Sequence, residues 1–129
     1  MEKRLVAIDG IYFLYADCFA KRCAEAMGHL SEEGSPLNSI CYMFWDICQL
    51  TWGFDCRENE IQAAVLNVLE KSLAINHRAC QEGALHGLGE IAHACPEQVH
   101  EIIDRFLGDI KLEAPLLAYA RNAREGNIQ

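Results

Sequence analysis

Three side chains in the stretch 79–94 have the types and spacing of a metal site. His86, Glu90 and His93 stand at positions i, i+4 and i+7, so a helix would bring them to one face. Two imidazoles and one carboxylate are ligands that Zn²⁺ or Fe²⁺ accepts, with a coordination position left open. Their order differs from the H-E-x-x-H pattern of zinc proteases. The sequence favours the simpler alternative, a solvated polar face that includes Glu82 and has Glu–His pairs one turn apart.

A nucleophilic thiol is the second chemical possibility. Cys80 has His77 nearby along the chain, and Cys56 precedes Arg57. Cys80, however, falls on an apolar stripe, where burial raises the pKa of a thiol, and Cys56 has no evident base. The seven cysteines include no C-x-x-C pair. We therefore expect reduced structural thiols in a cytoplasmic protein, and no catalytic site.

The helix expected over residues 36–52 has more apolar surface than one inward face requires. Such a helix is either central in its domain or covered by a partner. We expect it to mediate self-association; a small-molecule pocket between helices is an alternative. The interface residues we predict on it are Tyr42, Trp45, Asp46, Gln49 and Trp52.

These candidate sites all lie on amphipathic segments that predict an all-α fold. Apolar residues recur at steps of three and four over 4–27, over 36–52, up to Leu73, over 79–94, over 96–107 and after Pro115. No alternating strand pattern is present. We predict about six helices in antiparallel pairs, in a single domain covering 1–129.

The stretch 79–109 carries a family resemblance. Its order Ala-Leu-x-x-Leu-Gly-x-Ile from Ala84, then Pro96, then Val-x-x-Ile-Ile-Asp-x-Phe-Leu from Val99, resembles a HEAT-type helical repeat. The glycines and histidines of its first helix depart from that pattern, and no second copy follows at a fixed period. The resemblance implies a HEAT/armadillo-like stack of helix pairs that acts as a protein-interaction scaffold.

Composition limits the classes of partner. The net charge is −8, and the 11 Lys and Arg residues are scattered, which argues against binding nucleic acid. No run of 18 apolar residues predicts a membrane helix, and Asp9 and Asp17 interrupt any signal peptide. We expect a non-enzymatic protein-interaction module that self-associates through 36–52. The alternatives are a small metal- or ligand-binding protein using the His/Glu row on 79–94, and a fragment or relative of a longer repeat protein.

Overall fold

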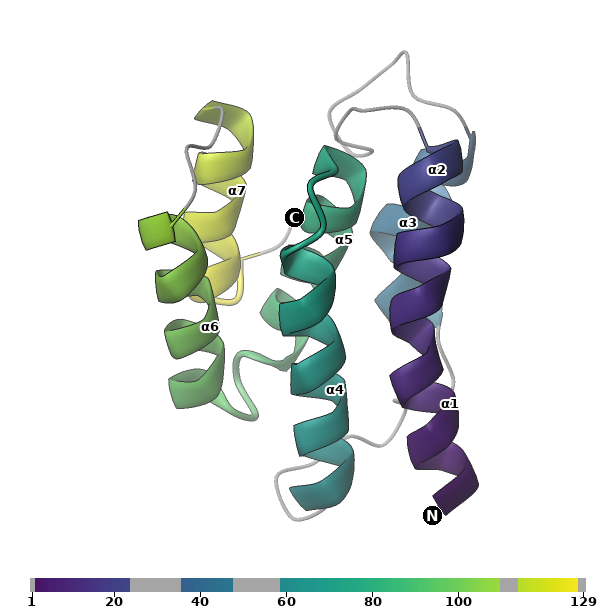
Figure 1. Cartoon of the computed structure of the whole chain (residues 1–129). Coiled ribbons are helices and arrows are strands. Elements are labelled where there is room, and N and C mark those ends of the chain that lie inside the picture. The colour runs from purple at the N-terminus through teal and green to yellow at the C-terminus, as the bar shows by residue number, and fades with distance from the viewer. Residues whose placement is uncertain (1, 24–35, 48–58, 110–113, 128–129) are drawn as a thin grey trace.

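The computed structural model describes residues 2–23, 36–47, 59–109 and 114–127, and within these ranges the predicted all-α class is confirmed (Figure 1). The described residues form helices joined by turns, without a strand. The helices are α1 (Glu2–Phe13), α2 (Ala20–Arg22), α3 (Pro36–Ile47), α4 (Asn59–Leu73), α5 (Arg78–Ile91), α6 (Pro96–Asp109) and α7 (Ala114–Arg124). A π-helical turn, η1 (Leu14–Phe19), joins α1 to α2.

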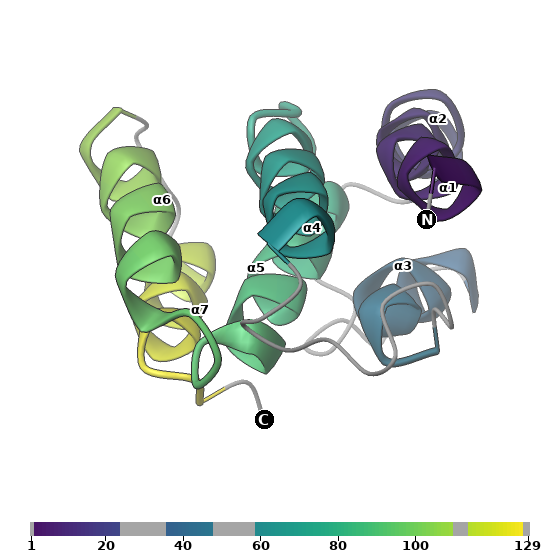
Figure 2. The same ribbon diagram turned by 90° about the horizontal axis from the view of Figure 1, so that it is seen from below.

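The helices form two layers, which are visible when the molecule is viewed from below (Figure 2). One layer contains α1, α4 and α6, and the other contains α3, α5 and α7. Within the layers, α1 packs on α4, and α5 packs on both α3 and α7. No helix within the described ranges has the length and apolar character needed to cross a membrane.

Helix α5 is the centre of the fold. Every residue from Ala79 to Gly89 is buried, because α3, α4 and α7 together surround this helix. The expectation that Glu82 and His86 lie on a solvated face is therefore wrong. The helix expected over 36–52, for which the sequence left a central position and a partner-covered position open, has its described part, α3, at one end of the stack (Figure 2).

Two glycines explain how α5 fits among so many neighbours. A Cβ atom on Gly83 would lie 2.7 Å from the backbone oxygen of Cys41. A Cβ atom on Gly87 would lie 2.6 Å from Leu69 and 2.7 Å from Trp45. Side chains larger than hydrogen do not fit at these distances, so both glycines allow close helix packing despite their cost in helix propensity.

Helices α5 and α6 follow one another through a tight turn at 92–95, where the sequence predicts one, but they are not each other's main partners. α5 packs chiefly on α3, α4 and α7, while α6 packs chiefly on α7. The inward stripe predicted on α6 faces the core: Val99, Ile102, Ile103 and Phe106 are buried, and Leu107, its fifth member, is partly buried. The two helices of the stretch 79–109 therefore pack mainly against other helices and not against each other.

Candidate functional site

The predicted interface residues of α3 divide between buried and undescribed positions. Tyr42 and Trp45 are buried within the chain, at 9% and 7% exposure. Asp46 belongs to α3, but its side chain is not described, and Gln49 and Trp52 lie outside the described residues. The two aromatic side chains that favoured an interface are therefore part of the core of this chain.

Among the described residues, the large apolar side chains that are exposed lie on α1 and on the outer face of α3. They are Val6 and Phe13 on α1, at 68% and 61% exposure, and Ile40 and Met43 on α3, at 47% and 41%. Each pair is spaced so that both members share one helix face, opposite the buried face of the same helix. α1 and α3 stand together at one end of the stack (Figure 2).

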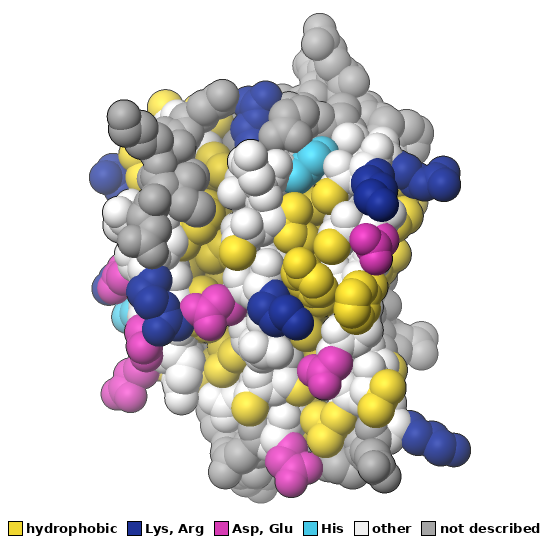
Figure 3. Space-filling view, viewed as in Figure 1, with side chains coloured by type: hydrophobic (Ala, Val, Ile, Leu, Met, Phe, Trp, Pro, Cys, Tyr) yellow, Lys and Arg dark blue, Asp and Glu magenta, His cyan; other side chains and the backbone are white. Residues whose placement is uncertain are grey.

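The α6–α7 end of the stack is charged. Arg124 binds both carboxylate oxygens of Asp104, through Nε at 2.7 Å and Nη2 at 3.1 Å. The hydrogen bonds from Arg124 lower the pKa of Asp104 below its usual range. Figure 3 shows acidic and basic side chains along α6, and apolar side chains together with charged ones on the side of α1. We call the set of exposed apolar side chains Val6 and Phe13 on α1 and Ile40 and Met43 on α3 the apolar end.

Two of the three predicted metal ligands lie together. Nε2 of His86 lies 3.4 Å from Oε1 of Glu90, as their spacing on α5 predicts. His93 follows the end of α5 at Ile91 and lies beside Gly126, whose Cβ position is 3.1 Å from its Nε2 atom. Across the part of the chain that is described, no group of three or more His, Cys, Asp or Glu side chains is placed to hold a metal ion.

His86 instead belongs to a buried hydrogen-bond network that links three helices. Its Nδ1 atom lies 3.1 Å from the hydroxyl of Tyr119 on α7, which donates to the hydroxyl of Tyr42 on α3 at 3.1 Å. The rings of Tyr42 and His86 are 4.5 Å apart. This arrangement satisfies polar atoms inside the fold, so it stabilises the packing of α3 and α7 on α5.

Three thiols meet where α3 and α5 approach the end of α2. Cys41 donates to the backbone oxygen of Ala79 at 3.4 Å, and Cys80 donates to that of Tyr15 at 3.6 Å. Hydrogen bonding with Cys80, together with burial, raises the pKa of Cys41. Burial also raises the pKa of Cys23 to about 11. Because the raised pKa keeps Cys23 and Cys41 protonated, these two thiols are poor nucleophiles, which agrees with a structural role for them.

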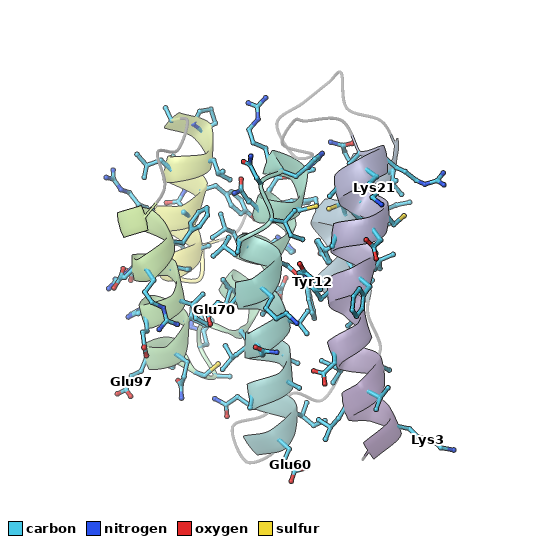
Figure 4. The ribbon with its side chains drawn as sticks, in the orientation of Figure 1. Lys3, Tyr12, Lys21, Glu60, Glu70 and Glu97 are labelled. Atoms are coloured by element: carbon cyan, nitrogen blue, oxygen red, sulfur yellow. The ribbon has the colours of Figure 1, made fainter. Side chains whose placement is uncertain are left out.

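A shallow groove of about 260 Å³ lies between α4 and α6. Arg105 on its wall forms ion pairs with Glu70 and Glu101, so its charge is already matched. Figure 4 shows Glu70 on α4, on the side nearest α6. Because Arg105 is paired in this way and the apolar lining is small, the groove offers little to hold a ligand.

Comparisons of the chain with protein-family models, with curated proteins and with solved structures gave no match. The functional interpretation therefore depends on the geometry of the chain itself. The sequence-based interface prediction did not include the exposed Val6 and Phe13, which are spaced by two helical turns on the side of the helix opposite Ile8 and Tyr15.

Proposed function

We propose that this protein is a non-enzymatic interaction module that self-associates through its apolar end. The observation that carries the proposal is the exposure of Val6, Phe13, Ile40 and Met43 on the two helices at one end of the stack. Exposed side chains of this size gain free energy when another surface removes them from water.

The difference between the two ends of the stack supports this proposal. In stacked helical proteins the terminal units need a polar outer face, because nothing further covers them. The α6–α7 end has such a face, with the Arg124–Asp104 and Arg124–Glu125 ion pairs. The α1–α3 end instead exposes Val6, Phe13, Ile40 and Met43, which a neighbour packed there would remove from water.

We propose that a second copy of the chain binds to the apolar end and covers it. An isologous contact places the same patch on both sides, so one apolar surface covers another and both are removed from water. The sequence-based expectation placed this role on 36–52. In the present proposal α3 still contributes to the interface, with Ile40 and Met43, and α1 contributes Val6 and Phe13.

Sedimentation velocity over a wide range of protein concentration tests the proposal. We expect the wild-type protein to sediment as a concentration-dependent dimer. The double substitution Phe13→Asp and Met43→Asp should yield a monomer with unchanged helicity, because both side chains are exposed in the single chain. Ala118→Asp, at an exposed position on α7, is the matched control and should leave the dimer intact.

A wild-type protein that remains monomeric at every concentration would refute self-association. A folded double variant that dimerises as strongly as the wild type would show that the apolar end is not the interface. Circular dichroism and the melting temperature of each variant establish whether it has kept its fold.

A further inference from the structure

The outer face of α1 continues into η1 as one exposed stripe. Lys3, Val6, Gly10, Phe13 and Asp17 follow one another at steps of three and four residues, and all five are exposed. Such steps keep side chains on the same face of a helix. The stripe lies opposite Ile8, Ile11 and Tyr15, which are buried.

The stripe is arranged symmetrically about Gly10. Lys3 and Asp17 are equally far from Gly10 along the chain, in opposite directions, and each is about 10 Å from it along the helix axis. Val6 and Phe13 occupy the intermediate positions, one on each side. A two-fold axis that passes beside Gly10 would therefore bring Lys3 of each copy near Asp17 of the other, and Val6 near Phe13.

Gly10 has open space where a side chain would be. Apart from its chain neighbours and the backbone of its own helix, no atom of the described residues lies within 4 Å of the position that a Cβ atom would occupy there. Glycine in the interior of a helix costs about 1 kcal/mol relative to alanine, so packing among these residues gives no reason for it. At the centre of a helix–helix contact, the absence of a side chain lets two backbones approach closely.

The two ends of the stripe carry opposite charges. Within the described ranges, no ion pair joins Lys3 or Asp17 to another residue. Figure 4 shows Lys3 at the lower end of α1, extending away from the other helices. Both charges can therefore meet opposite charges on a partner.

We infer that α1 packs against α1 of a second copy in antiparallel orientation, with the helices crossing at Gly10 and with reciprocal Lys3–Asp17 ion pairs. This inference rests on the proposed self-association and specifies its geometry. The apolar contact of Val6 with Phe13 supplies most of the affinity, and the charges select the antiparallel register.

Complementary charge reversal tests this geometry by sedimentation equilibrium. Lys3→Glu alone and Asp17→Lys alone should each raise the dimer Kd about tenfold, because each change turns two attractive pairs into repulsive ones. An equimolar mixture of the two variants should recover the affinity of the wild type. In the mixed dimer the glutamate introduced at position 3 of one copy faces the lysine introduced at position 17 of the other, and the remaining pair is unchanged.

Two controls separate the ion pairs from the net charge. Arg121→Glu on α7 and Glu97→Lys on α6 make the same charge changes at exposed positions away from α1, and they should leave Kd within about twofold of the wild type. Figure 4 shows Glu97 at the lower end of α6, on the opposite side of the molecule from Lys3.

The outcomes distinguish this inference from the proposed function. A wild-type dimer whose Kd is insensitive to both reversals, or weak single variants whose mixture stays weak, would overturn the antiparallel α1 contact and leave self-association standing. A wild-type monomer would overturn both.

Discussion

The hydroxyl of Tyr119 lies 3.1 Å from Nδ1 of His86, in the buried interior between α7 and α5. The same hydroxyl donates to Tyr42 on α3, so one phenol connects the three helices of the second layer. His86, a candidate metal ligand by its sequence spacing, thus has a structural role that depends on a residue far along the chain.

Replacing Tyr119 by Phe should destabilise the protein by about 1–3 kcal/mol. The substitution keeps the ring but leaves polar atoms of His86 and Tyr42 without this buried partner, and an unsatisfied buried group costs that much. Urea unfolding followed by circular dichroism measures the change. Tyr12→Phe is the control, because this half-buried ring contacts Lys71 through its face and the substitution keeps the ring. Its free energy of unfolding should change little. Equal stability of both variants would show that the network contributes nothing.

Replacing Gly83 by Ala should also destabilise the fold, by about 1–3 kcal/mol. Its new methyl group would lie 2.7 Å from the backbone oxygen of Cys41, which cannot move without shifting α3. Gly108→Ala provides the contrast, because nothing among the described residues lies within 4 Å of its Cβ position on α6. That variant should be as stable as the wild type or more so, through better helix propensity. Thermal unfolding of the two variants, measured under the same conditions, tests this prediction. A Gly83 variant as stable as the Gly108 variant would contradict the close approach of α3 and α5.

The ion pair of Asp104 with Arg124 should make stability depend on acidity. The hydrogen bonds from Arg124 lower the folded-state pKa of Asp104 below its ordinary value of 3.8. The charged carboxylate therefore stabilises the folded state at pH values above 3.8, and this contribution is lost as the pH falls through the lower folded-state pKa. Asp104→Asn should have a free energy of unfolding that falls less steeply in this acidic range, measured by urea titration at each pH. Identical slopes for the two proteins would show that the pair is not coupled to folding.

The sequence alone determined the helices, because apolar residues recurring every three or four positions are stable only when a helix gathers them on one side. The inward stripe of α6 is the clearest example: of the five residues expected on it, Val99, Ile102, Ile103 and Phe106 are buried and Leu107 is partly buried. The spacing of His86 and Glu90 likewise predicted their proximity on α5. These relationships are local, so they follow from the geometry of one helix.

Only the tertiary structure decided what covers each helix. The polar side of α5 was expected to face water, yet Glu82 and His86 are both buried, and Tyr42 and Tyr119 come from other helices to contact His86. Conversely, the sequence left open whether the helix over 36–52 is central or covered by a partner, and Ile40 and Met43 of α3 are exposed because α3 lies at the end of the stack. Periodicity identifies the apolar side of a helix, but whether the other side is also covered depends on residues distant in the sequence that hydrogen-bond or pack against it.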